Sequence, residues 1–300
     1  MDEQAWLTER FEEHRARLRA VAFRMLGSLS EADDAVQEAW LRFSRADRRD
    51  VTNLGGFLTT VVARVCLNVL RSRRQRGEEP LDVHVPDPIV SPDSGADPEH
   101  EAVLADAVGL ALLVVLEALT PAERVAFVLH DMFAVPFEEI GAMLDRSPVA
   151  TRQLASRARH RVRGQSVAPD PDVRRQRVVV DAFFAADRDG DLDGLIAVLD
   201  PDVVLRADGG TSPARPTFTM RGAANVAGQA ITGERFAPFV HPALVNGAAG
   251  VVVAAKGRLL SVMGFTVAND RIVAIDVLWD PVRLAGLDLG GLIPASGHDG

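Results

Sequence analysis

The feature that most constrains this fold is an acidic, proline-rich stretch that divides the chain. Residues 77–107 carry nine acidic side chains and neither lysine nor arginine. The prolines in this stretch are Pro80, Pro86, Pro88, Pro92 and Pro98. Proline lacks the amide donor that a helix needs and favours an extended residue before it. The stretch therefore predicts an extended linker between separately folded blocks.

A second break follows at residues 166–172, where Pro169 and Pro171 must end the preceding helix. A chain of 300 residues is long enough for two or three compact units. We therefore expect units at 1–76, 102–166 and 173–288, with a linker at 77–101 and a tail at 289–300.

The charge of the chain is uneven along its length. The net charge is −9, yet residues 1–76 hold 14 arginines against 11 acidic residues, and residues 108–168 hold seven against six. Arginine-rich segments of this kind are typical of nucleic-acid binding. The single Lys256 follows no glycine-rich turn, which excludes a P-loop, and the single Cys66 excludes an internal disulfide and a thiolate zinc cluster. We expect neither a metal nor a cofactor.

The N-terminus and the apolar runs predict the cellular compartment. The N-terminus is acidic and polar, without the basic and apolar regions of a signal peptide. The longest apolar runs are far shorter than the ~20 residues of a membrane-spanning helix. We expect a cytoplasmic protein with no membrane partner.

The first unit has the periodicity of helices throughout. Residues 29–43 place Val36, Ala39 and Phe43 on one apolar face and polar side chains on the other. A later helix begins near residue 53 and ends in a basic cluster at 71–76.

The run LSEADDAVQEAWLRF at 29–43 resembles region 2 of the extracytoplasmic-function sigma factors, which bind the clamp of core RNA polymerase. The resemblance implies that Asp34, Gln37 and Glu38 contact the polymerase. It also implies that residues 54–76 melt and read the promoter −10 element. The candidates for this contact are polar and basic: Arg64, Asn68, Arg71, Arg73 and Arg74.

Residues 136–144 and 147–163 form two expected helices joined by a short turn, which is typical of a helix-turn-helix. The block resembles sigma region 4, which reads the promoter −35 element and binds the polymerase flap. In such a motif the second helix enters the major groove, where side chains contact base edges and phosphates. The candidates in that helix are Arg152, Gln153, Ser156, Arg157 and Arg159.

The last unit changes character. Two helices and a strand near 203–207 lead to β-rich runs at 240–245, 250–256, 258–267 and 272–279. The pairs Asn246-Gly247 and Asn269-Asp270 predict tight turns between strands. Residues 187–195 resemble the NTF2-like and SnoaL-like families. The expected fold is therefore two all-α sigma domains, a region 2 bundle and a region 4 helix-turn-helix, followed by an α+β NTF2-like cone.

A sigma factor fused to a SnoaL-like domain is similar to a known arrangement in which the added domain regulates the factor. That resemblance implies regulatory contacts in three stretches whose motifs are degenerate here. Their residues are Pro86, Asp87, Pro88, Asp208, Gly209, Gly210, Asp280, Pro281 and Arg283. Our hypothesis is an intramolecular clasp, in which the cone packs on the linker and on region 2.

Two other readings stay open. The cone could hold a small ligand, or act as an enzyme with Asp202, Asp208 or Asp276 as general base, although the chain has no tyrosine to serve as an oxyanion donor. The chain could also be a small-molecule-responsive DNA-binding regulator that acts without core polymerase. The reading we favour is non-enzymatic: a sigma factor that directs core RNA polymerase to promoter DNA, modulated by its own C-terminal domain.

Overall fold

The computed structural model describes residues 3–45, 53–75, 83–93, 109–165, 169–232, 238–289 and 292. The chain forms two compact units. Unit 1 comprises Met1–Glu79 and Val115–Gln165, and unit 2 comprises Pro80–Val114 and Ser166–Gly300. Both arginine-rich blocks thus belong to one unit, and the linker is grouped with the C-terminal domain. Residues 77–82 and 94–108 of the expected linker and region 4, and most of the tail, lie outside the described residues.

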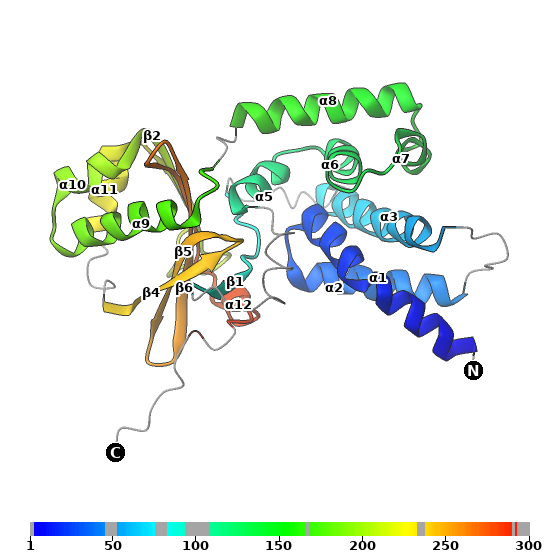
Figure 1. Ribbon diagram of the computed structural model, residues 1–300, viewed down its shortest axis with the longest axis horizontal. Coiled ribbons are helices and arrows are strands. Elements are labelled where there is room, and N and C mark those ends of the chain that lie inside the picture. The colour runs from blue at the N-terminus through cyan, green and yellow to red at the C-terminus, as the bar shows by residue number, and fades with distance from the viewer. Residues whose placement is uncertain are drawn as a thin grey trace, which may run out of the picture. The chain divides into compact units, whose positions relative to one another are not determined.

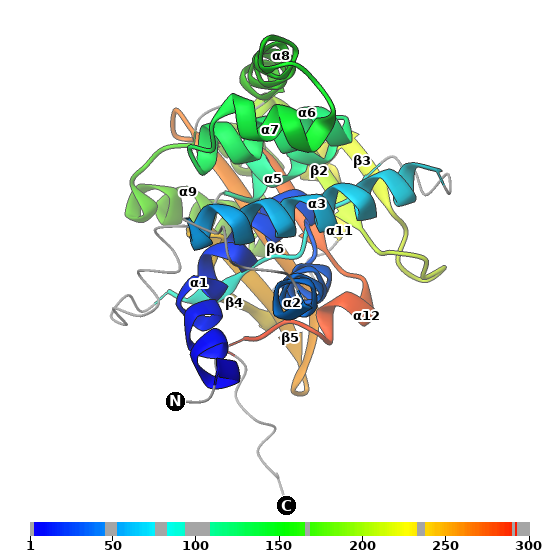
Figure 2. The same cartoon turned by 90° about the vertical axis from the view of Figure 1, so that its right-hand side faces the viewer.

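The N-terminal part of unit 1 is a bundle of three long helices, α1 (Glu3–Leu26), α2 (Leu29–Arg45) and α3 (Leu54–Gln75), which contact one another pairwise. Figure 2 shows α2 nearly end-on, beside α1 and below α3. The apolar face expected for α2 is buried, with Val36, Ala39 and Phe43 each at most 1% exposed. The bundle therefore forms around the side chains that the periodicity selects.

Helix α3 is, among the described residues, the one helix long and apolar enough to cross a membrane. Its apolar residues Leu58, Val62 and Cys66 are fully buried within the bundle. A core helix of a folded domain passes the same test of length and composition, so we assign α3 to the core of the bundle.

Helix α5 (Leu110–Glu117) crosses from unit 2 into unit 1. The described rest of unit 1 consists of α6 (Pro121–Phe127), the π-helix η1 (Val128–Met132), α7 (Phe137–Leu144) and the longer α8 (Pro148–Gln165). Thr120 and Glu123 form a capping box at the start of α6. Helices α7 and α8 are joined by a turn in which Asp145 adopts a left-handed conformation, with φ of 55°. This arrangement confirms the expected helix-turn-helix.

The described residues of unit 2 from 169 onward form helices that pack with a seven-stranded sheet (Figure 1). The helices are α9 (Val173–Arg188), α10 (Leu192–Val198), α11 (Ala223–Thr232) and α12 (Pro281–Leu284). The strands are β1 (Val90–Pro92), β2 (Leu199–Asp208), β3 (Phe218–Arg221), β4 (Val240–Val245), β5 (Ala248–Ala255), β6 (Arg258–Ala268) and β7 (Arg271–Leu278). Their order is β1-β4-β5-β6-β7-β2-β3, with β2 parallel to β7 and the other pairs antiparallel. This is the α+β class expected from the sequence.

The predicted turns are present between these strands. Asn246 and Gly247 have φ of 51° and 76°, and Asn269 and Asp270 have φ of 53° and 60°. Positive φ at both central residues is the requirement of the tightest hairpin turns. The order of residues at each turn therefore fixes where β4 meets β5 and where β6 meets β7.

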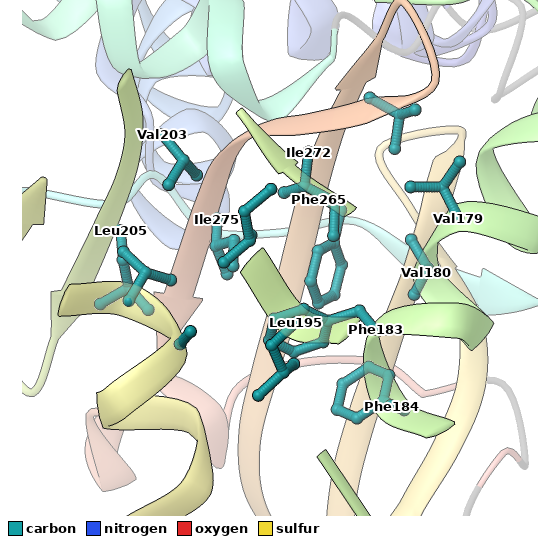
Figure 3. Close-up of a cluster of buried hydrophobic side chains, with 14 of the residues drawn as sticks. Val179, Val180, Phe183, Phe184, Leu195, Val203, Leu205, Phe265, Ile272 and Ile275 are labelled. Atoms are coloured by element: carbon teal, nitrogen blue, oxygen red, sulfur yellow. The ribbon is translucent and has the colours of Figure 1, made fainter. Parts of the chain in front are cut away.

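The sheet of unit 2 buries a different apolar cluster on each face. The helix-side cluster lies against α9 and α10 and contains the side chains of Figure 3, among them Phe183, Leu195 and Phe265. The linker-side cluster contains Val83, Val85 and Val90 from the linker together with residues of β4 to β7. The linker therefore contributes to the core of the C-terminal domain.

Candidate functional site

The polar face of α2 is available to a partner. Asp34 and Gln37 are exposed and lie one turn apart, and Glu38 accepts a hydrogen bond from Arg42 at 2.8 Å. Leu41 lies one turn beyond Gln37 and is 40% exposed. Leu41 thus adds one apolar side chain to the polar face of α2. Sequence reasoning missed Leu41, although its spacing from Asp34 and Gln37 places it on the same face.

Helix α3 presents an exposed polar stripe. Arg64, Asn68, Arg71 and Arg74 are exposed and follow one another at intervals of four, three and three residues, the spacing of a single helix face. The stripe can place cations along a nucleic-acid backbone.

Arg73 differs from the other arginines of α3. Its guanidinium pairs with the carboxylate of Glu31 and donates to the carbonyl oxygen of Leu26 at 3.3 Å. These contacts attach the end of α3 to the junction of α1 and α2. The structure thus does not bring Arg73 onto the stripe with the other −10 candidates. Its ion partner is 42 residues away in the sequence, so the sequence alone did not reveal this difference.

Helix α8 exposes a central row of neutral polar side chains. Gln153 and Ser156 are exposed, whereas Thr151, Ala155 and Ala158 are buried against the unit. His160 is exposed and lies one turn beyond Ser156 on the same face. His160 was not among the sequence candidates, although its spacing from Gln153 and Ser156 places it on the same helix face. A row of this kind can form hydrogen bonds to base edges.

Arginines border this row on both sides, and neighbouring helices hold them. On one side, Arg152 lies over the ring of Phe137 with its Cζ 5.2 Å from the ring centre, and Arg159 pairs with Asp131 at 2.9 Å. On the other side, Arg157 pairs with Glu123 at 3.3 Å. The −35 candidates therefore come together on one surface, with the arginines at its edges.

In unit 2, Arg283 of α12 joins the linker to the cone. Its Nε donates to Asp87 Oδ1 at 2.7 Å, and its Nη1 donates to Asp208 Oδ2 at 2.9 Å. Its Nη2 donates to the carbonyl oxygen of Val85 at 2.5 Å. We call His84, Asp87, Asp208 and Arg283 the clasp cluster.

Asp208 is the buried centre of the clasp cluster, with its side chain 4% exposed. Burial alone raises its pKa, but hydrogen bonds from His84, Val85 N–H and Gly210 N–H and the charge of Arg283 lower the pKa to about 2. The carboxylate is therefore ionised at neutral pH and binds two linker residues at once.

Three further contacts hold the linker segment, residues 83–93, along the cone. Strand β1 pairs with β4 in an antiparallel ladder. Ile89 donates its N–H to Asn246 Oδ1 at 3.1 Å, and Asn246 donates its own N–H to the carbonyl oxygen of Ile89 at 2.8 Å. Arg177 of α9 pairs with Asp93 at 2.8 Å. The segment is thus fixed at both ends and in its middle.

The remaining candidates for regulatory contacts support the clasp cluster in part. Pro86 and Pro88 are buried on either side of Asp87. A Cβ on Gly209 would lie 1.8 Å from the carbonyl oxygen of Arg215, and Gly210 has a φ of 64°. Gly209 is therefore required by the close approach of the Arg215 backbone, and Gly210 is favoured by its left-handed conformation.

At the last of the three stretches, Asp280 caps α12 by accepting the N–H of Val282 at 2.9 Å. Pro281 is exposed. The stretch therefore starts the helix that carries Arg283.

The carboxylates considered for catalysis do not converge. Asp276 lies between Ile275 and Val277 of the helix-side cluster and so points to the opposite face of the sheet, where it pairs with Arg206 at 2.8 Å. Burial raises the pKa of Asp276, and Arg206 opposes that effect. Asp208 serves the clasp cluster, and Asp202 is exposed. The geometry does not favour a general base in the cone.

Two family comparisons match the helical parts of the chain. Residues 10–76 match Sigma-70 region 2, and residues 109–162 match Sigma-70, region 4. The first match covers the three-helix bundle that carries the α2 face and the α3 stripe. The second covers the helix-turn-helix that carries α8.

Relatives match over nearly the whole length. The chain is 39% identical to the ECF RNA polymerase sigma factor SigJ of Mycobacterium tuberculosis, over 90% of this chain and 89% of the relative. It is 36% identical to the probable ECF RNA polymerase sigma factor SigI of the same species, over 93% and 95%. The crystal structure of SigJ covers 94% of this chain and 99% of its own, with a TM-score of 0.74. By these matches, the chain belongs to the family of ECF RNA polymerase sigma factors.

Proposed function

We propose that this sigma factor joins core RNA polymerase through the α2 face, with Asp34, Gln37 and Glu38 on the clamp. We propose that the region 4 block also contacts the flap. The observation that carries the proposal is the exposed row of Asp34, Gln37 and Leu41 on a helix whose other face is buried. We propose that the protein binds core polymerase in the cytoplasm, where transcription takes place.

Promoter recognition is divided between two helices in this proposal. The α3 stripe contacts the −10 element, where Arg64, Arg71 and Arg74 supply the cations that an opened duplex needs. Helix α8 contacts the −35 element through its central row and its bordering arginines. Arg73 acts by holding α3 in place.

We also propose that unit 2 modulates this activity through the linker segment. The clasp cluster restricts the conformations of the segment that connects the two arginine-rich blocks. This restriction matters because the spacing of those blocks must match the spacing of the two promoter elements. Contact between the cone and region 2, the other half of the clasp hypothesis, stays a prediction. A small ligand in the cone also stays a prediction.

Replacing Gln37 with alanine should weaken binding of the full chain to purified core polymerase about 30-fold, the effect of losing one interface hot spot. Asp34→Ala should act in the same direction. Binding is measured by fluorescence anisotropy of the labelled chain. Glu9→Ala on exposed α1 serves as the control and should bind as the wild type does. Equal affinities for all variants would show that the α2 face is not the contact.

A further inference from the structure

One buried carboxylate holds two arginines at the edge of the α8 surface. Glu123 Oε1 accepts from Arg157 Nε at 3.3 Å, and Glu123 Oε2 accepts from Arg161 Nη1 at 2.7 Å. Arg157 and Arg161 are one helical turn apart, so both guanidinium groups reach the same carboxylate. Their side chains stay 57% and 47% exposed, while that of Glu123 is 4% exposed.

Glu123 is fixed by contacts that do not involve α8. As part of the capping box of α6, it accepts hydrogen bonds from Thr120 N–H at 3.2 Å and Thr120 Oγ1 at 2.7 Å. Burial raises the pKa of Glu123, but these hydrogen bonds, the charge of Arg161 and the hydrogen bond from Arg157 outweigh it, and the net pKa is lowered. The carboxylate is therefore a rigid negative charge beneath α8.

A charge in this position has two effects on the arginines above it. It restricts each guanidinium to one orientation, so less freedom is lost when a phosphate binds. It also cancels one of their two positive charges. Affinity for any DNA sequence grows with the number of phosphates that cations neutralise, whereas base-edge contacts depend on a fixed register. A lower net charge, together with fixed orientations of the two arginines, favours discrimination between DNA sequences over affinity for all of them.

We propose that Glu123 is a positioning residue for promoter recognition: it orients Arg157 and Arg161 at the edge of the α8 surface and limits non-specific attraction to DNA. This inference rests on the proposed contact between α8 and the −35 element. Glu123 lies under the helix and acts through the two arginines.

Glu123→Gln separates these effects from folding, because glutamine also completes a capping box. Holoenzyme is assembled from core polymerase and the full chain, and its affinity is measured for a promoter duplex selected from a genomic library. The same duplex with a scrambled −35 element is the comparison, and both are titrated with salt. Glu139→Gln, an exposed carboxylate of α7, is the matched control for loss of one charge.

We expect Glu123→Gln to lower the preference for the intact −35 element about tenfold. We also expect the slope of log affinity against log salt on scrambled DNA to steepen by about one. Glu139→Gln should change neither. The double variant Glu123→Gln, Arg161→Gln should restore the wild-type slope but not the preference.

Each contrary outcome has one meaning. A wild-type slope and preference in Glu123→Gln, with circular dichroism showing a folded chain, would overturn the inference. A steeper slope that the double variant fails to restore would overturn the charge effect. If wild-type holoenzyme does not distinguish the intact from the scrambled −35 element, the proposed function of α8 fails instead.

Discussion

Arg283→Met is expected to release the linker segment from the cone. The substitution leaves Asp87 and Asp208 buried without the guanidinium that pairs with both, and breaking a buried ion pair from one side costs about 3–5 kcal/mol. The side chains of these carboxylates are 10% and 4% exposed, so water cannot compensate without opening the contact. Opening the contact exposes Val83 and Val85 and removes the pairing of β1 with β4.

Hydrogen exchange monitored by mass spectrometry measures this release. Amides of residues 83–93 should exchange much faster in Arg283→Met than in the wild type. Arg258→Met, at an exposed position of β6, is the matched control and should leave that exchange unchanged. Wild-type protection in Arg283→Met would contradict the assigned role of the clasp cluster.

The Asp208 carboxylate of this contact should stay ionised throughout the physiological pH range. The pKa of Asp208 is lowered from its ordinary 3.8 to about 2, so its stabilising contribution is complete above 3.8 and is lost only as the pH falls through about 2. The part of the linker protection that depends on the Asp208 carboxylate should therefore stay constant from about pH 5 to pH 8.

Arg124→Met is expected to destabilise unit 1 by about 3–5 kcal/mol. Arg124 of α6 is 3% exposed and donates Nη1 to the carbonyl oxygen of Met25 at 2.9 Å. It also forms a two-point ion pair with Glu117, at 2.8 and 3.0 Å. Removing the guanidinium leaves the Glu117 carboxylate, whose side chain is 11% exposed, without this ion partner and breaks a link between the region 2 and region 4 blocks.

Urea unfolding followed by circular dichroism tests this expectation. The free energy of unfolding of unit 1 should fall in Arg124→Met. The double variant Arg124→Met, Glu117→Leu should recover part of the loss, because both charges are then absent. Arg146→Met removes an exposed arginine near α7 and should leave the transition in place. An unchanged transition in Arg124→Met would show that the buried pair does not stabilise the unit.

Local patterns of the sequence predicted much of this structure. The buried face of α2 and the two tight turns of the sheet each depend on residues close together in the chain. The second helix of the helix-turn-helix, predicted at 147–163, is likewise present as α8 at Pro148–Gln165. Helical and strand periodicities and turn residues are short-range signals, and for that reason they can be read without a structure.

The missed features depend on residues far apart in sequence. Arg283 and Asp87 are 196 positions apart, and the family resemblance named both residues without showing that they pair with each other. Strand β1 is three residues long and forms because β4 offers an edge for it. The roles of Arg73 and Glu123 follow from the packing of helices, which decides whether a charged side chain meets a carboxylate or solvent. The π-helix η1 had no recognised sequence signal.

Run-off transcription with purified core polymerase and a genomic promoter library tests the central claim most directly. The full chain should direct core polymerase to a small set of start sites, and the chain with Asp34 and Gln37 both replaced by alanine should not. The chain alone should bind those promoters weakly. Tight promoter binding by the chain alone, with no transcript on addition of core polymerase, would contradict the account and favour a DNA-binding regulator that acts without the polymerase.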